Sequence, residues 1–361
     1  MDVKRPLKIL FLPRYGLSGP SSRYRFFQYL GILKEYKFII KVKPFFSDKY
    51  VRALYSDGKT NIIQILKGYL KRFLILFTIT KYDLIVIEYE LFPFFPSIFE
   101  KIIKRTGKRY IVDYDDAIFI RYINHRSWLA RSLFHRKIEK VINCADCVIT
   151  GNRYLKEYAI RFNENVHIIP TVVSRIKYDA VPRPESRTRF VLGWTGSYST
   201  SKYLIPLCKV LRDLKRDDIQ IHFIGFDKNL RYLFDGINVI WIEWDQETEI
   251  SEIKNFNVGI MPLEDDQWSA GKCGFKIIQY MACGIPVIAS PVGVNKELIE
   301  HGINGFLASG EDEWKSSVLY FVNNPEQALI MGNCGYKKFI TSYSLEANAK
   351  KYLDIIKSSI F

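Results

Sequence analysis

The stretch from Gly271 to Ala308 constrains the fold of this chain more than any other part of the sequence. It begins with a loop bounded by Gly271 and Gly274, and apolar residues at helical spacing follow. Gly284 and Pro286 then end the predicted helix, because glycine suits the position after a helix and proline cannot continue one. A short apolar strand and further glycine-containing turns come next. This alternation predicts a strand–loop–helix unit of a parallel sheet.

The same loop is a candidate anion site. The N–H groups of a first helical turn and the helix dipole favour negative charge. Lys272 and Lys276 add full positive charges there, so a diphosphate would fit. Spacing alone supports equally well an ordinary helix start whose lysines are only solvated.

Residues that follow the loop carry a family resemblance. The segment 281–290 reads MACGIPVIAS, Gly293 and Glu297 follow, and 304–307 reads NGFL. Together they resemble the C-terminal signature of retaining family-4 (group 1) glycosyltransferases. The resemblance implies an α/β chain with two Rossmann-like domains facing across a cleft, the GT-B fold, in which the C-terminal domain binds a nucleotide sugar.

One departure from the family concerns its pair of glutamates seven residues apart. These would fall on Gly271 and Gln279, so neither carboxylate is present, and Gln279 could contact a ribose hydroxyl only without charge assistance. Farther upstream, Gly196 and Ser197 follow an apolar segment, and Lys202 matches the family's diphosphate-clamping lysine, whereas the accompanying arginine is absent. The resemblance thus implies donor contacts by Gly196, Ser197, Lys202, Lys272, Cys273, Gly274, Phe275, Lys276, Gln279 and Glu297.

The N-terminal half begins with an apolar strand at 7–12 and a glycine-containing loop. Ser21 or Ser22 could cap the helix predicted from Arg23 to Leu33. Loops at the carboxyl ends of strands bind ligands in open α/β sheets. We therefore expect acceptor or phosphate contacts here, although a capped surface helix explains the same residues; the candidates are Gly19, Ser22, Arg23, Arg25 and Asp113.

Three carboxylates, Asp113, Asp115 and Asp116, end another predicted strand that begins at Arg109. They could orient an acceptor, or they could only cap a helix and form local ion pairs. Asp113 and Asp115 form a D-x-D pattern, which binds metals in the other glycosyltransferase architecture. Since the resemblance is to GT-B enzymes, we expect no metal and no cofactor. The predicted catalytic residues are Asp115, Asp116, Lys202 and Lys276.

The length of 361 residues favours two domains. We predict an acceptor-side domain over 1–180, a nucleotide-sugar domain over 181–343 and a final helix over 344–361 that returns to the first domain. The linker is expected within 172–188, where prolines and charged residues break the periodicity.

Positive charge is concentrated in the first half. Residues 1–183 contain 34 Lys and Arg against 16 Asp and Glu, whereas the remainder contains 19 against 22. Such a surplus favours phosphate-rich partners. The apolar segment 62–80 and the phenylalanines of 92–99 could contact a membrane or pack in the core. Lys67, Lys71 and Arg72 argue against a transmembrane span, and the six scattered cysteines favour a cytoplasmic, reduced protein.

We therefore predict a retaining, metal-independent glycosyltransferase, with a nucleotide sugar as its donor. Its acceptor would be a lipid-linked saccharide of polysaccharide or glycoconjugate synthesis, and the protein would bind peripherally to the anionic inner face of the cytoplasmic membrane. A nucleotide-sugar epimerase of the same fold is one alternative. A basic nucleic-acid-binding protein is another, although no nucleic-acid-binding signature is present.

Overall fold

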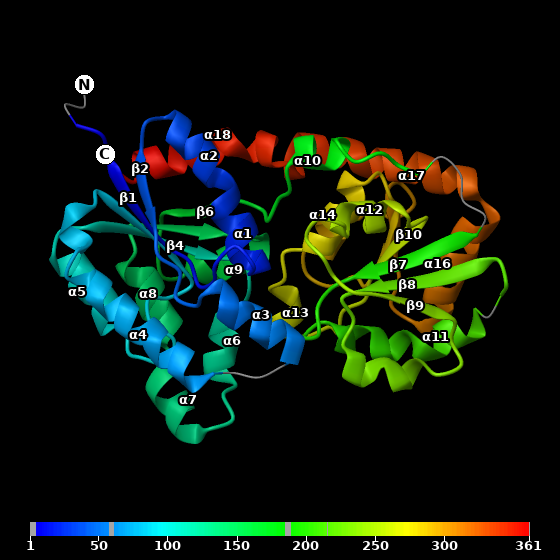
Figure 1. The fold of residues 1–361 in the computed structure, drawn as a ribbon, viewed down its shortest axis with the longest axis horizontal. Helices are drawn as coiled ribbons and strands as arrows, with labels where there is room; N and C mark the ends of the chain where they lie inside the picture. Colours follow the sequence, from blue (N-terminus) through cyan, green and yellow to red (C-terminus); the bar gives the residue numbers. More distant parts are fainter. Residues whose placement is uncertain (1–4, 58–60, 185–188, 215, 361) are drawn as a thin grey trace. The chain divides into compact units, whose positions relative to one another are not determined.

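The computed structural model describes residues 5–57, 61–184, 189–214 and 216–360. The chain forms two compact α/β units (Figure 1). Unit 1 consists of Met1–Thr171, Gly271–Cys273 and Asn348–Phe361, and unit 2 of Val172–Ala270 and Gly274–Ala347.

Unit 1 contains a six-stranded parallel sheet in the order β2-β1-β3-β4-β5-β6. All residues of β3 are buried, as expected of a strand with helices on both faces. The order reverses at β1, so the loops after β1 and β3 flank the position where open α/β sheets bind ligands. The strands are β1 (Lys8–Leu12), β2 (Ile39–Val42), β3 (Leu84–Glu88), β4 (Arg109–Tyr114), β5 (Cys147–Thr150) and β6 (Val166–Ile168).

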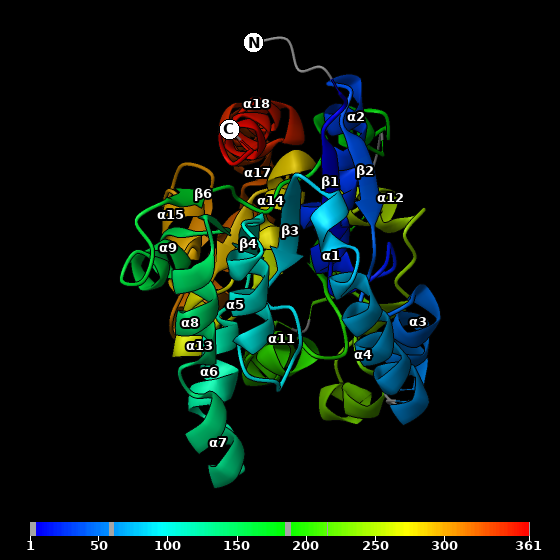
Figure 2. The same ribbon diagram turned by 90° about the vertical axis from the view of Figure 1, so that its left-hand side faces the viewer.

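Helices of unit 1 pack around this sheet, with α2 beside β2, α5 on β4, and α9 beside β5 and β6 (Figure 2). The α-helices are α1 (Pro20–Arg25), α2 (Leu30–Glu35), α3 (Asp48–Asp57), α4 (Ile62–Leu76), α5 (Ile98–Arg105), α6 (Ile118–Ile123), α7 (Trp128–Phe134), α8 (Lys137–Cys144) and α9 (Arg153–Ala159), and short 3₁₀ turns are η1 (Phe27–Tyr29) and η2 (Ile79–Lys81). The last helix, α18 (Leu345–Ser358), contributes Tyr352, whose ring stacks on Tyr29 with centroids 4.1 Å apart.

Unit 2 contains a second six-stranded parallel sheet, in the order β12-β11-β10-β7-β8-β9. Numbered from β7, this is the Rossmann strand order, with its switch point between β7 and β10. The strands are β7 (Phe190–Thr195), β8 (Ile219–Ile224), β9 (Val239–Ile242), β10 (Val258–Met261), β11 (Val287–Ala289) and β12 (Gly305–Leu307).

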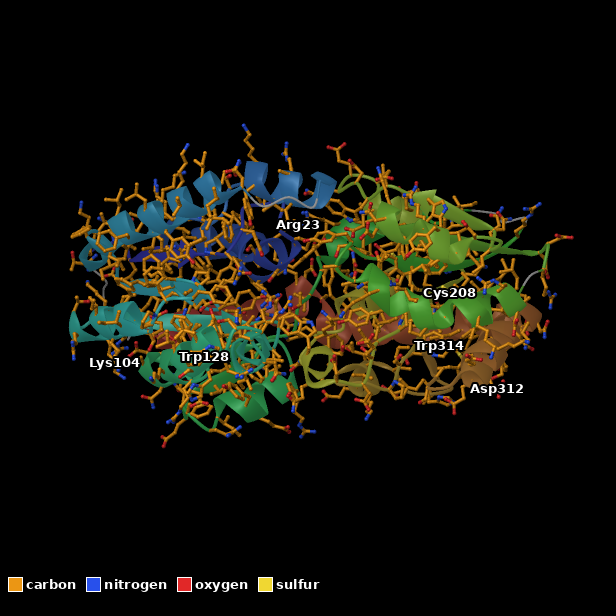
Figure 3. All side chains as sticks on the ribbon, turned by 90° about the horizontal axis from the view of Figure 1, so that it is seen from below. Arg23, Lys104, Trp128, Cys208, Asp312 and Trp314 are labelled. Atoms are coloured by element: carbon orange, nitrogen blue, oxygen red, sulfur yellow. The ribbon has the colours of Figure 1, made fainter. Side chains whose placement is uncertain are left out.

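The core of unit 2 lies between its sheet and the helices α11 and α16, and it includes Trp194, Phe223 and Trp314. Figure 3 labels Cys208, the first residue of α11, and Trp314 of α16. The helices are α10 (Arg175–Asp179), η3 (Ser201–Leu207), α11 (Cys208–Asp213), η4 (Lys228–Phe234), α12 (Glu249–Lys254), α13 (Gln267–Ala270), α14 (Phe275–Ala282), α15 (Asn295–Leu298), α16 (Glu311–Asn323), α17 (Pro325–Lys338) and the π-helical turn η5 (Phe339–Tyr343).

The prediction of two Rossmann-like α/β domains is confirmed. The boundary differs from the one expected at residue 180, because α10 is grouped with unit 2, where Tyr178 bonds to Gln279 and its carbonyl accepts from Lys254. Of the predicted linker 172–188, residues 185–188 lie outside the described residues. At the other end, residues 348–361 are grouped with unit 1, whereas 344–347 stay with unit 2.

One local prediction is wrong. Neither Ser21 nor Ser22 caps the first helix, because α1 already begins at Pro20 after Gly19, and both serines lie inside it. Farther along the chain, His135 and Arg136 separate α7 from α8.

Candidate active site

In unit 2, predicted donor residues meet around Trp194. This buried side chain belongs to β7, and a Cβ on Gly196 would lie 2.2 Å from its ring, so only glycine fits there. The Lys276 Nζ lies 5.5 Å from the centroid of the same ring. The loop after β7 and the first turn of α14 are therefore held together by Trp194, which sequence reasoning did not single out.

The turn that follows β7 is closed by its own hydroxyl groups. The Ser197 N–H donates to the Thr200 Oγ1 over 3.0 Å, and the Ser201 Oγ donates to the Ser197 carbonyl over 3.1 Å. Lys202 is exposed, with its Nζ 5.0 Å from the centroid of the Tyr203 ring. This segment is a 3₁₀ helix with Pro206 inside it, and the α-helix proper begins at Cys208.

Gly274 immediately precedes α14 and has a φ of 63°, a left-handed conformation that favours glycine. A Cβ here would also lie 2.3 Å from the Leu298 Cδ1. Phe275 and Lys276 form the first turn of α14 and are half-buried, so this helix start offers backbone N–H groups beside a lysine. Glu297, on α15, is exposed.

Gln279 does not lie with these residues. Its side chain is buried inside unit 2, where the Nε2 donates to the Tyr178 hydroxyl over 3.1 Å. The amide is thus used in anchoring α10, and the structure gives it no exposed surface for a ribose.

In unit 1, polar side chains gather at the carboxyl ends of β1, β3 and β4. We call this cluster, which includes Ser21, Glu88, Tyr89 and Asp115, the acidic edge. Its centre is Asp115, whose carboxylate accepts from the Ser21 Oγ over 2.6 Å and from the Tyr89 hydroxyl. The Glu88 Oε1 lies 2.8 Å from the same Ser21 Oγ. Tyr89 has a φ of 64°, an unfavourable conformation for a bulky residue that is typical of functional sites.

The loop 271–273 completes the acidic edge. The Lys272 Nζ lies 3.9 Å from the Asp116 Oδ1, and the Cys273 thiol donates to the Asp115 carbonyl over 3.0 Å. Asn152 fixes this loop by donating to the carbonyls of Gly271 and Lys272, each over 2.9 Å. Burial raises the pKa of Cys273 well above its usual value, so the thiol stays protonated. Lys272 and Cys273, predicted as donor contacts, therefore lie beside the predicted acceptor carboxylates.

Arg25 and Asp113 are buried against each other. The guanidinium donates to both carboxylate oxygens, over 2.8 and 3.0 Å, and also to the Ile169 carbonyl. Burial raises the pKa of Asp113 to about 6, and Arg25 opposes this rise, so the pair is ionised at neutral pH. Arg25 and Asp113, both predicted to contact a ligand, thus form an ion pair with each other and stabilise the edge of the sheet.

The remaining candidates of the first loop lie nearby. A Cβ on Gly19 would lie 2.3 Å from the Tyr15 Cβ, so this glycine permits a tight turn. Arg23, labelled in Figure 3, is largely buried, with its guanidinium 4.9 Å from the Tyr24 ring centroid. Ser22 is fully buried and donates to the Glu88 Oε2 over 2.5 Å.

The sequence analysis did not identify Glu88 and Glu90 as candidate site residues. Both flank Tyr89 and are buried, and Glu90 pairs with Lys137 and lies 3.8 Å from the Arg14 guanidinium. Burial first, and the charge of Asp115 second, raise the pKa of Glu88 to about 7, while hydrogen bonds from Ser22 and Arg14 oppose the rise. The available signal was their position at the end of a fully apolar strand, next to the strand that carries Asp113.

Comparisons with known proteins identify related sequences and related folds. Residues 189–324 match the family model of glycosyl transferases group 1. The predicted resemblance to this family is confirmed. The chain is 25% identical over 247 residues to a probable sucrose-phosphate synthase of Thermosipho melanesiensis, a match that covers 61% of this chain and 56% of the relative. The chain thus spans little more than half the length of that curated relative.

Solved structures show the same fold over nearly the whole chain. The sucrose-phosphate synthase of Thermosynechococcus elongatus aligns with a TM-score of 0.70 at 15% identity and covers 98% of both chains. Anabaena HepE, solved in complex with UDP, aligns with a TM-score of 0.69 at 15% identity and covers 98% of this chain and all of that one. The predicted GT-B fold is therefore confirmed.

Proposed function

We propose that the protein transfers a sugar, with retention, from a nucleotide-sugar donor to an acceptor hydroxyl. The observation that carries this proposal is the family match over unit 2, which includes Gly196, Lys202 and the first turn of α14. Charge builds on the leaving diphosphate as the glycosidic bond breaks, and enzymes stabilise such charge with preorganised cations and N–H groups. Lys276 and the N–H groups that follow Gly274 can supply both.

A donor screen tests this function. The purified protein is incubated with nucleotide sugars and simple acceptors, and the released nucleoside diphosphate is measured. Proton NMR of the product then reports whether the anomeric configuration is retained. Incubation with donor alone separates the transferase from an epimerase, because an epimerase would change the sugar without releasing diphosphate.

We further propose that turnover needs no divalent metal. Among the described residues, no group of three or more His, Cys, Asp or Glu side chains is placed to hold a metal ion. Asp113, the first acid of the D-x-D pattern, has both its oxygens bonded to Arg25. We expect EDTA to leave the release of nucleoside diphosphate unchanged. Loss of turnover with EDTA and its recovery with manganese would contradict metal independence.

The acceptor, in this proposal, is a lipid-linked saccharide at an anionic membrane surface. The support comes from α4, whose apolar residues point outward: Ile62, Leu66, Leu70, Phe73 and Phe77 recur every three or four residues and are exposed. Exposed apolar rows of this size mark contact surfaces. Lys67 and Lys71 are exposed on the same helix and could approach anionic headgroups.

Two further segments of unit 1 also expose large apolar side chains. Phe94 and Phe95 are exposed, whereas Phe92 is buried, so the predicted aromatic cluster is divided between surface and core. On α7, Trp128 and the two leucines Leu129 and Leu133 are each more than half exposed, and Figure 2 shows α7 at the lower end of unit 1. Among the described residues, no helix combines the length and apolar character needed to cross a bilayer.

A further inference from the structure

One hydroxyl group at the acidic edge lies between two carboxyl groups. The Ser21 Oγ is 2.8 Å from the Glu88 Oε1 and 2.6 Å from the Asp115 Oδ2. A serine hydroxyl carries a single proton, so it can donate to only one of these oxygens. The other short contact is a hydrogen bond only if that carboxyl group is itself protonated and donates to the serine oxygen.

The surroundings decide which carboxyl group carries this proton. Glu88 is 2% exposed, and its Oε2 already accepts from the Ser22 hydroxyl and from the Arg14 N–H over 2.6 Å. Only its Oε1 faces Ser21. Asp115 is half-buried and accepts from the Tyr89 hydroxyl on its other oxygen. Placing the proton on the Glu88 Oε1 satisfies both carboxyl contacts of Ser21 and leaves the charge on the more exposed Asp115.

The charged groups around Glu88 agree with this assignment. Within the described residues, no lysine or arginine forms an ion pair with Glu88. Arg72, from α4, donates to the carbonyls of Leu12 and Pro13, while Arg14 points toward Glu90 and Arg25 pairs with Asp113. Burial first, and then the negative charge of Asp115, favour the neutral form of this buried acid. The pKa of about 7 follows from that same geometry.

We propose that Glu88 and Ser21 are positioning residues for Asp115: the Glu88 carboxyl donates to Ser21, and Ser21 donates to Asp115, whose carboxylate accepts a hydrogen bond from the acceptor's hydroxyl group. This inference rests on the proposed transferase function. Asp115 orients the acceptor hydroxyl, and the Glu88 proton stays in place.

This arrangement predicts a specific pH dependence. When Glu88 loses its proton at alkaline pH, the Ser21 hydroxyl has two anionic acceptors and no donor. Asp115 then loses its orienting hydrogen bond for part of the time, so turnover falls as the pH rises above about 7. In Glu88→Gln, the amide N–H donates to Ser21 at every pH, so this alkaline fall should disappear.

The experiment compares wild type, Glu88→Gln, Ser21→Ala and a matched control, Glu100→Gln. Glu100 is also a buried glutamate of unit 1. Its Oε1 accepts a 2.9 Å hydrogen bond from the Leu91 N–H rather than from Ser21. The first readout is infrared difference spectroscopy of the free protein. We expect a protonated-carboxyl band that titrates near neutral pH in wild type and in Glu100→Gln, and that is absent in Glu88→Gln.

The second readout is the pH profile of nucleoside diphosphate release. We expect the alkaline fall above about pH 7 to disappear in Glu88→Gln but to stay in Glu100→Gln, and Ser21→Ala to lower kcat about tenfold. A band that persists in Glu88→Gln, or a pH profile unchanged by this substitution, would overturn the inference. A titrating Glu88 band with no glycosyl transfer from any nucleotide sugar would instead overturn the proposed function and, with it, the role of Asp115.

Discussion

Lys276 is the single residue on which the proposed donor site of unit 2 depends most. It lies in the first turn of α14, a kind of position where helices favour anions, and its ammonium lies over the buried Trp194. Both features favour an anion at this position. The side chain is half-buried, so its removal leaves the core of unit 2 intact.

We predict that Lys276→Ala lowers turnover about a hundredfold or more, because one cation opposite a developing oxyanion typically contributes that much. The melting temperature should stay close to that of the wild type. Lys296→Ala, which removes an exposed lysine of the neighbouring α15, is the control and should leave turnover unchanged. Near-normal turnover of Lys276→Ala would refute the phosphate contact.

Glu88 links the acidic edge to the stability of the protein. Its pKa in the folded protein, about 7, lies above the ordinary value of 4.5. The folded state therefore binds this proton more tightly than the unfolded state, and the contribution to the free energy of unfolding is fully present below about pH 4.5 and is lost as the pH rises to about 7.

We predict that the melting temperature of Glu88→Gln rises relative to wild type between about pH 5 and about pH 8, because the glutamine has no proton to lose. Thermal unfolding at both pH values measures this difference, and Glu100→Gln shows how far the trend is specific to Glu88. A constant difference across the range would mean that Glu88 does not titrate there.

Single residues also show where sequence reasoning ends. The loop glycines, Lys276 and the three aspartates could be found from spacing and resemblance, because these signals are local in the chain. Glu88 and its partner Ser21 are 67 positions apart, and only the strand order brings β3 beside β1. Gln279 fits the family pattern in sequence, yet its side chain turns inward to Tyr178, a contact that no local pattern encodes.

At the scale of elements, α4 presents an inverted pattern. Its polar Arg72 is buried, donating to backbone carbonyls, while its large apolar residues face outward. Arg72 is therefore not one of the surface cations that α4 offers to a membrane, and burial lowers the pKa of this arginine to about 9. Gly68 lies on the same inner face, where the helix approaches Phe45 closely.

We predict that Gly68→Ala destabilises unit 1 although alanine is the better helix former. An added Cβ would lie 2.8 Å from the Phe45 carbonyl oxygen and 3.0 Å from its ring, so the helix must shift. Gly31→Ala in α2 is the matched control: nothing lies within 4 Å of its added Cβ, and it should stabilise by up to about 1 kcal/mol. Urea unfolding of both variants tests the pair; equal effects would contradict the close approach of α4.

Most elements could be predicted from the sequence. The strand expected at 7–12 and the one expected to begin at Arg109 correspond to β1 and β4, because short apolar segments between turn residues are typical of buried parallel strands. The break between α7 and α8 was not predictable from periodicity, since the apolar side chains of α7 are exposed rather than packed in the core. Helical spacing identifies an apolar face but not what covers it.

At the scale of the whole molecule, the two units differ in charge as well as in strand order. The surplus of eighteen positive charges lies in residues 1–183, which include nearly all of unit 1, whereas the rest of the chain has a net charge of −3. A donor site in unit 2 does not account for this distribution. An anionic surface that meets unit 1 does account for it, and it would also cover the outward apolar row of α4.

We therefore predict that the protein floats with anionic vesicles and not with neutral ones, and that salt weakens the binding. Each basic residue near such a surface contributes about 1 kcal/mol, so replacing Lys67 and Lys71 with serine should weaken binding roughly thirtyfold. Leu70→Ser with Phe73→Ser should weaken it further without lowering the melting temperature, because both side chains are exposed. Lys228→Ser with Lys296→Ser, which removes two exposed lysines of unit 2, is the matched control and should leave flotation unchanged. Equal recovery on both kinds of vesicle, or on neither, would exclude a membrane-borne acceptor and leave the transferase proposal to be judged by the donor screen alone.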